Sequence, residues 1–171
     1  IGLSSAQAAP AAVRDGSSAQ AAAASCWDIK QTNGAAASGT YWLLTPQLKA
    51  PAQFQCDMTT DGGGWVLVGR GREGWQPVYE GQGDPENLLG ARTSFNTTQL
   101  GSKTIDALLG GGDVKSLDDG VRLRRATNTA GTAWQEGRFK LSARDRWVWT
   151  FGANHNLTSY GFQNSGGSWQ N

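Results

Sequence analysis

The feature that most constrains this protein is its glycine content, with 24 glycines among 171 residues. That is about twice the usual share of roughly 7%. Glycine weakens the interior of helices and strands but is frequent in turns, and long apolar runs are few. The pattern therefore indicates short strands joined by many turns, not a helical bundle. The length favours a single domain with its own hydrophobic core.

Charge and hydropathy exclude two classes of function. The sequence has 15 Lys and Arg residues against 14 Asp and Glu residues, a net charge of +1. A general nucleic-acid binder would show a clustered positive excess, so no nucleic-acid partner is expected. No run of about 18 apolar residues exists, so no membrane span is predicted. Eight tryptophans are enough to leave some for a surface ligand.

The two cysteines, Cys26 and Cys56, fit either a disulfide pair or two free thiols of a cytosolic protein. Residues 5–10, Ser-Ala-Gln-Ala-Ala-Pro, are similar to the small-residue end of an export signal. Export would place both thiols in an oxidising compartment, where they would bridge. The composition, rich in Ala and Gly and poor in Lys, is typical of a bacterial protein.

The pattern along the sequence predicts a mainly β, α+β domain after a flexible arm or signal remnant at residues 1–24. Residues 25–171 would form the domain, with a subdomain at about 25–70, a sheet subdomain at about 71–151 and a loop-rich tail at 152–171. One main helix is expected, from Thr98 to Leu109, where an apolar stripe ends at three glycines. Strands are expected at 41–44, 54–58, 65–68, 121–126, 134–141 and 147–151.

Three segments resemble the opening of the fibrinogen C-terminal globular domain, and equally that of the intelectin lectins. They are residues 25–30 (SCWDIK), 38–43 (SGTYWL) and 56–65 (CDMTTDGGGW). The resemblance implies a Cys26–Cys56 disulfide, which would contribute about 3–4 kcal/mol by restricting the unfolded state. It also implies structural roles, not binding roles, for residues of the third segment: Asp57, Gly62, Gly63, Gly64 and Trp65.

The second half of the protein resembles the family less. Residues 98–151 follow the order of its second subdomain, a helix and then a twisted, largely antiparallel sheet, but the likeness ends after Phe151. No further cysteine and no Asp-rich calcium loop follow Asp145. The C-terminal third of the family fold is thus expected to be absent or shortened, in a fragment or a short relative. No cofactor is predicted, because no motif in the sequence supports calcium.

Several motifs have simpler structural explanations than functional ones. Residues 69–74 (GRGREG) match a dinucleotide-binding pattern, but Trp75 to Gly81 cannot supply the helix that such a site needs. Asp84, Glu86 and Asn87 offer oxygen ligands, yet Asp84-Pro85 is better explained as the start of a helical turn. Arg122 and Arg124 share the polar face of a predicted strand. This is the ordinary pattern of a solvated sheet surface, and the functional alternative is an anion-binding site.

No catalytic motif is present, and the protein is predicted not to be an enzyme. His155 is the only histidine and has no nucleophile motif beside it. A polysaccharide hydrolase needs two carboxylates at a fixed separation, and no acidic pair stands in a recognisable context. A hydrolase acting on polysaccharide is therefore kept only as a third and unfavoured hypothesis, which requires two carboxylates within about 5–10 Å of each other in a cleft.

Aromatic residues in predicted loops are the candidates for ligand binding, because sugar faces stack on aromatic rings while hydroxyl groups bind nearby polar side chains. The first hypothesis is a secreted or cell-surface module that binds a glycan or another surface ligand. The second is a structural or protein–protein module that contacts itself or other domains of a larger protein. The candidate ligand residues are Trp75, Tyr79, Asp84, Asn87, His155, Tyr160 and Trp169.

Overall fold

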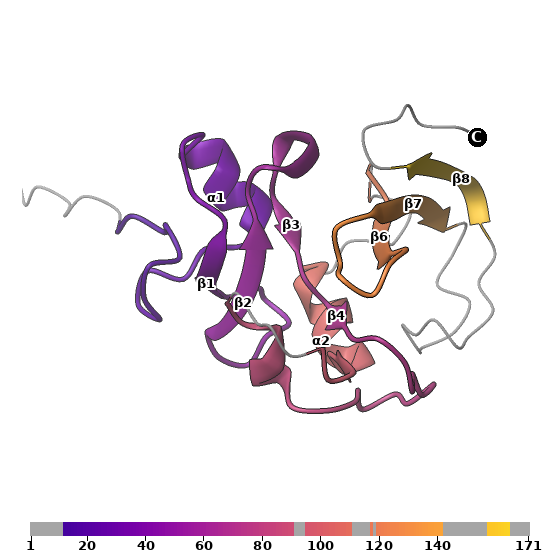
Figure 1. Ribbon diagram of the computed structural model, residues 1–171. Coiled ribbons are helices and arrows are strands. Elements are labelled where there is room, and N and C mark those ends of the chain that lie inside the picture. Colours follow the sequence, from indigo (N-terminus) through magenta and orange to yellow (C-terminus); the bar gives the residue numbers. More distant parts are fainter. Residues whose placement is uncertain (1–11, 91–94, 111–116, 118, 142–156, 165–171) are drawn as a thin grey trace, which may run out of the picture.

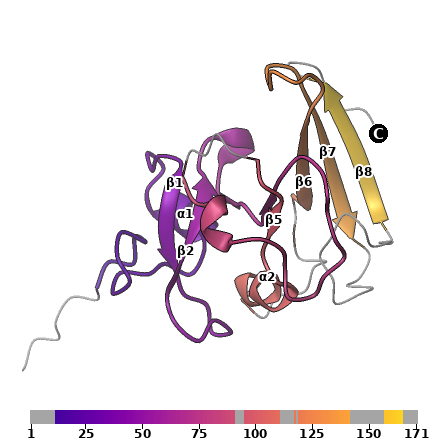
Figure 2. The ribbon, with the colours of Figure 1, turned by 60° about the horizontal axis from the view of Figure 1, so that its bottom comes forward.

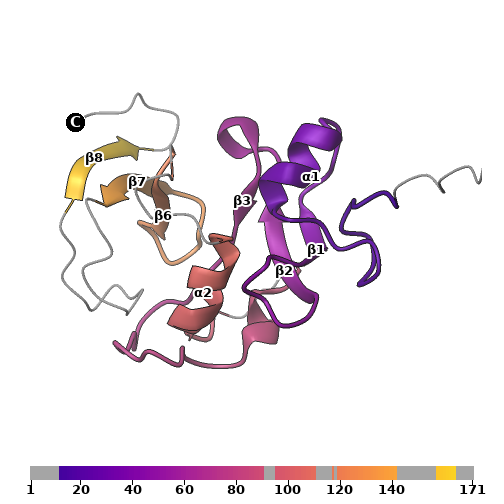
Figure 3. The ribbon, with the colours of Figure 1, turned by 180° about the vertical axis from the view of Figure 1, so that it is seen from behind.

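The computed structural model describes residues 12–90, 95–110, 117, 119–141 and 157–164, with the backbone alone for 141, 157–159 and 162–164. We call residues 12–90 and 95–110 the N-terminal body, and residues 119–141 with 157–164 the C-terminal sheet. Figures 1 and 3 show the C-terminal sheet on the opposite side of the molecule from helix α1 (Cys26–Thr32), with strand β3 (Trp65–Val66) between them.

The N-terminal body is built on an antiparallel sheet of β1 (Gly39–Leu43), β2 (Ala52–Asp57) and β3. The strands expected at 41–44 and 54–58 are confirmed within two residues. The strand expected at 65–68 is shorter, because contact with β2 ends at the hydrogen bond from the Leu67 N–H to the Gln55 carbonyl and residues 69–70 pair elsewhere.

Helix α1 was not predicted from the sequence. It begins at Ser25, whose Oγ accepts a hydrogen bond from the Asp28 backbone N–H at 2.9 Å. Ile29 and Cys26 point into the core from this helix, with exposed fractions of 2% each. Among the described residues, α2 (Ser102–Leu108) corresponds to the main helix expected from the sequence, and α1, also of seven residues, is additional to it.

The predicted disulfide is present and joins α1 to β2. Cys26 and Cys56 are bonded, with a Cα–Cα distance of 5.6 Å. Both cysteines lie within the main hydrophobic core. Every buried member of that core belongs to the N-terminal body, and its largest members include Ile29, Leu43, Phe54, Met58, Leu100 and Ile105.

Residues 16–24 lie along β1, although a flexible arm was expected over residues 1–24. The Gly16 carbonyl accepts from the Trp42 N–H at 2.8 Å, and the Ala23 N–H donates to the Trp42 carbonyl at 3.1 Å. Ala23 is fully buried and bridges Leu43 in parallel. The small side chains that argued against packing in fact allow this close backbone approach, so the expectation is wrong for residues 16–24.

The middle of the molecule forms a short antiparallel pair, β4 (Gly69–Arg70) with β5 (Thr98–Gln99), and two helical segments, η2 (Pro85–Leu88) and α2 (Ser102–Leu108). The helix expected from Thr98 starts four residues late. Gln82 and Gln99 exchange backbone hydrogen bonds of 3.0 and 2.8 Å, which hold Gln99 in an extended conformation. This tertiary pairing overrides the helical pattern at residues 98–101.

The C-terminal sheet is antiparallel throughout, in the order β6 (Val121–Ala126), β7 (Trp134–Leu141) and β8 (Leu157–Asn164) (Figures 1 and 2). The first two strands match the prediction. The third corrects it, because residues 157–164 of the expected loop-rich tail form an eight-residue strand paired with β7. The strand expected at 147–151 lies outside the described residues.

The architecture is therefore mainly β, with largely antiparallel sheets and one disulfide, as predicted. Among the described residues, no helix is long and apolar enough to cross a membrane.

Candidate functional site

The segment from Asp57 to Trp65 forms a tight left-handed turn, with η1 (Thr60–Gly62) at its centre. Asp61, Gly62, Gly63 and Gly64 all have positive φ, from 47° to 88°. A Cβ atom at Gly63 would lie 2.2 Å from the Met58 carbonyl oxygen. Positive φ thus favours glycine at all three positions, and the close approach of neighbouring atoms requires it at Gly63 and Gly64 as well.

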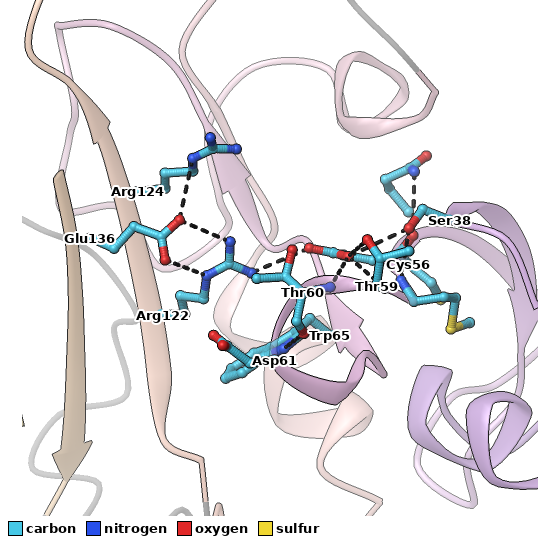
Figure 4. Close-up of polar contacts among 12 residues, drawn as sticks. Ser38, Cys56, Thr59, Thr60, Asp61, Trp65, Arg122, Arg124 and Glu136 are labelled. Atoms are coloured by element: carbon cyan, nitrogen blue, oxygen red, sulfur yellow. Dashed lines mark hydrogen bonds and ion pairs between the residues drawn. The ribbon is translucent and has the colours of Figure 1, made fainter. Parts of the chain in front are cut away.

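The carboxylate of Asp57 closes this turn from its N-terminal end. Its Oδ1 accepts hydrogen bonds from the backbone N–H groups of Thr59 and Thr60, each at 3.0 Å, and from the Ser38 hydroxyl at 3.4 Å (Figure 4). At the other end of the turn, Trp65 Nε1 donates to the Thr60 carbonyl at 2.9 Å. The Trp65 side chain is half-buried.

Charged side chains connect this turn to the C-terminal sheet. Arg122 on β6 donates to Asp57 Oδ2 through Nη1 at 3.2 Å and to both carboxylate oxygens of Glu136 on β7, at 3.2 and 3.3 Å (Figure 4). Arg138 on β7 pairs with Asp61. We call Asp57, Asp61, Trp65, Arg122, Glu136 and Arg138 the charged junction.

Trp65 lies at the centre of this junction. The guanidinium carbons of Arg122 and Arg138 are 5.7 and 5.2 Å from its ring centroid, within the range of a cation–π interaction. The Arg122 side chain is only 12% exposed. The alternation of β6 does put Arg122 and Arg124 on one face, but Arg122 is not a solvated surface residue, and the anions that it binds are Asp57 and Glu136.

The surroundings of Asp57 and Arg122 favour the charged form of each side chain. Burial disfavours the Asp57 carboxylate, but hydrogen bonds from Thr60, then Thr59 and Arg122, outweigh it and hold the pKa of Asp57 well below its usual range. Asp57 is therefore ionised at neutral pH and cannot donate a proton. Desolvation likewise opposes the charge of Arg122, but Glu136 and Asp57 raise its pKa. Ion pairs of this kind stabilise structure.

The candidates Trp75 and Tyr79 lie in one closed loop of residues 74–82, which we call the aromatic loop. The amide group of Gln82 closes it: Oε1 accepts from the Gln76 N–H at 2.9 Å, and Nε2 donates to the Gly74 carbonyl at 2.8 Å. The Tyr79 carbonyl accepts from the Ser102 N–H at 2.8 Å, which anchors the loop to the start of α2. Both aromatic side chains are half-buried.

The remaining candidates are dispersed. Asp84 is the N-cap of η2, and its Oδ1 accepts from the Glu86 N–H at 3.0 Å, with Pro85 in the first turn as predicted. Asn87 is half-buried in η2. Tyr160 is 55% exposed and lies on strand β8 opposite Phe139, not in a loop. His155 and Trp169 lie outside the described residues.

Three other site types find little support in the described part of the molecule. An open, mostly apolar groove lies between β2, η2 and α2, and its lining, which includes Phe54, Leu67, Leu88 and Leu100, contains no carboxylate. No group of three His, Cys, Asp or Glu side chains within the described ranges could hold a metal ion. Residues 69–74 open no helix, so the dinucleotide pattern there has no anion site.

The sequence reasoning missed two kinds of residue. Gln82 closes the aromatic loop through its side-chain amide, and no motif in the sequence marks it for this role. The partners of Arg122 and Arg138 lie 65 and 77 residues away, and no local pattern points to such contacts.

Comparison with known proteins gives a single family. The family model described as fibrinogen beta and gamma chains, C-terminal globular domain, matches residues 22–140, more than half of this protein. Human tenascin-N is 40% identical over 83 residues, and human angiopoietin-4 is 33% identical over 89 residues. These matches cover 43% and 47% of this sequence but only 6% and 18% of the relatives, so it spans a small part of their length.

Among solved structures, the fibrinogen-like globe domain of human ANGPTL2 superposes on 82% of this protein and 59% of its own length, with a TM-score of 0.48 and 17% identity. Tenascin-N and the angiopoietins are secreted extracellular proteins, and a disulfide such as Cys26–Cys56 persists in that oxidising setting. The protein is accordingly secreted or located at the cell surface, as predicted. From the match over residues 22–140, it belongs to the fibrinogen C-terminal globular domain family.

Proposed function

We propose that this protein is an extracellular recognition module, not an enzyme, and that its aromatic loop binds a glycan on a surface ligand. The observation that carries the proposal is the closure of residues 74–82 by the Gln82 amide. A loop held in one conformation before binding loses little conformational entropy when it binds, which favours affinity. Trp75 and Tyr79 supply rings for stacking on sugar faces.

The polar surroundings of the loop fit the same ligand class. Gln76 and Glu80 are exposed within it, and Asp84 is exposed just beyond it. A sugar needs such groups for its hydroxyls, together with an apolar platform for its C–H face. The proposal needs no metal, and the protein's own side chains are the binding groups.

The test is a glycan array followed by titration of tryptophan fluorescence with the sugars that bind. Trp75→Ala should weaken binding about tenfold or more, the effect of removing a central aromatic contact. Trp27→Ala is the control, because Trp27 is 52% exposed on α1, which lies apart from β4 and the segment that follows it (Figure 1). Equal binding by both variants would place the ligand elsewhere, and no response to any glycan would reject a lectin role.

A second function, protein–protein contact within a larger protein, is favoured by a separate observation. Phe95 is 41% exposed and lies under the Arg72 guanidinium, 5.8 Å from its ring centroid, while Val78 in the aromatic loop is 38% exposed. Aromatic and arginine side chains of this kind are enriched at protein interfaces. Self-association that Phe95→Ala abolishes, in a protein that binds no glycan, would support this function over the first.

A further inference from the structure

We propose that the charged junction is a reversible clasp, from which the C-terminal sheet can separate while both parts of the molecule stay folded. This inference does not depend on the proposed ligand. Its first basis is the placement of the core. All residues of the main hydrophobic cluster, and the half-buried apolar residues packed against it, lie between Ala23 and Leu108, so among the described residues the C-terminal sheet shares no part of that cluster.

Within the described residues, the interactions that cross between the two parts include the ion pairs Asp57–Arg122 and Asp61–Arg138 and the two guanidinium contacts with Trp65. Each of these involves a charged side chain. The carboxylates retain solvent access, with exposed fractions of 35% for Asp57 and 39% for Asp61. Ion pairs at such positions are individually weak and are screened by salt, unlike a buried apolar interface.

Separation would leave no charge buried without a partner. Arg122 would keep both hydrogen bonds to Glu136, because Arg122 and Glu136 lie on adjacent strands of the same sheet. Asp57 would keep the backbone N–H groups of Thr59 and Thr60 within its own turn. Opening therefore does not strand a buried charge, which is the main cost of breaking most ion pairs.

The second pair follows the same rule. Arg138 has another carboxylate on its own side of the junction, with Asp119 Oδ1 at 3.8 Å from Nη1. Asp61 would become solvated in an exposed turn. Trp65 would lose both guanidinium contacts but keep its Nε1 hydrogen bond to Thr60. The line of separation thus passes between η1 and the strand pair β6–β7 (Figure 4).

The test uses the double variant Asp57→Asn/Asp61→Asn. Asparagine keeps the shape and the acceptor oxygen needed at Asp57, and it tolerates the positive φ of Asp61. Removing each charge should raise the population of the open form roughly two- to fivefold. The measurement is small-angle X-ray scattering across a salt series of about 20 mM to 1 M NaCl, over which screening becomes strong. Circular dichroism checks that the sheets persist.

The control Glu73→Gln/Glu80→Gln changes the net charge equally at exposed sites outside the junction. We expect the radius of gyration to rise with salt, to rise further in the junction variant, and to be unchanged by the control substitutions. A radius insensitive to salt and to both variants would overturn the clasp. Loss of all secondary structure in one step in the junction variant would also overturn it, because the two parts would then not fold separately.

Trp65 offers an independent reading of the same equilibrium. The fluorescence difference between the unsubstituted protein and Trp65→Phe isolates this ring from the other seven tryptophans. That difference should change with salt in parallel with the scattering. A double-mutant cycle of Asp61→Asn and Arg138→Gln should give non-additive shifts in the salt midpoint, and additive shifts would exclude the pair as part of the clasp.

Discussion

The N-terminal body and the C-terminal sheet each contain a three-stranded antiparallel sheet, but they are stabilised in different ways. The first has a disulfide, a helix packed on it and fully buried Leu43 and Met58. The second relies on its ladder hydrogen bonds and on the ion pairs of Arg122 and Arg138. Apolar burial and a covalent link resist salt, whereas ion pairs do not.

The comparison separates two structural duties within one family domain. The motif CDMTTDGGGW, through which the protein resembles its relatives, forms the end of β2 and the turn that holds Asp57, Asp61 and Trp65. The same ten residues thus complete the core, through Cys56 and Met58, and hold the sheet, through three side chains on the opposite side of the turn. A single turn serves both parts of the molecule.

The largest expected effect is on the N-terminal body. Replacing both cysteines, Cys26→Ala/Cys56→Ala, should reduce its free energy of unfolding by about 3–4 kcal/mol, because the unlinked polypeptide gains entropy when unfolded. Urea denaturation followed by circular dichroism gives this value. Amide hydrogen exchange then shows how much of this loss of stability falls on the N-terminal body and how much on the C-terminal sheet.

Exchange should accelerate in β1 and β2 and much less in β6 and β7. Equal acceleration in all four strands would contradict the distinction drawn between the two parts, since it would mean that they unfold as one unit. A Ser25→Ala variant serves as the control for disturbance of α1, because it removes the helix cap and leaves the disulfide intact.

A smaller loss is expected at the turn that both parts share. Gly63→Ala places a methyl group against the Met58 carbonyl oxygen at a residue whose φ is 78°. Strain of this kind costs roughly 1–3 kcal/mol. Gly34→Ala is the matched control, because a Cβ there meets no atom within 4 Å. The two variants are compared by thermal unfolding, and equal midpoints would show that the turn relaxes without cost.

Local patterns in the sequence were sufficient for part of this fold. Strands β1, β2, β6 and β7 follow from alternating apolar residues between turn signals, and the N-cap role of Asp84 follows from the proline after it. The disulfide came from the family resemblance, since two cysteines alone left free thiols open. The helical stripe at residues 98–109 was only half right, because backbone pairing with Gln82 drew Gln99 into a strand.

What escaped prediction depends on contacts between distant residues. Burial of Ala23 requires the backbone of Trp42, and residues so small have no apolar signal of their own. The partner of Arg122 could not be chosen from 14 acidic residues by alternation alone. At the candidate site, Trp75 and Tyr79 share a loop. Tyr160 was expected in a loop but lies in a strand, because β8 pairs with β7.

The smallest expected effect is a pH dependence confined to the junction. The pKa of Asp57 in the folded protein lies below its unfolded value of 3.8, so its contribution to stability is complete above that value. It declines as the pH falls below 3.8 toward the lowered native pKa. Glu136, Asp61 and Asp119 are the other acids that face Arg122 and Arg138. Solvent screening limits the contribution to about 1 kcal/mol or less.

Asp57→Asn measures this contribution directly. The stability difference between the unsubstituted protein and the variant should be constant from about pH 5 to pH 7 and should shrink as the pH falls from about 4 toward 2. Chemical denaturation at each pH supplies the difference, and Glu80→Gln is the control because Glu80 is exposed and lies outside the junction. A difference that stays constant down to about pH 2 would mean that the Asp57 carboxylate contributes only its shape. In that case the charged attachment of the C-terminal sheet would rest on Asp61 and Arg138 alone.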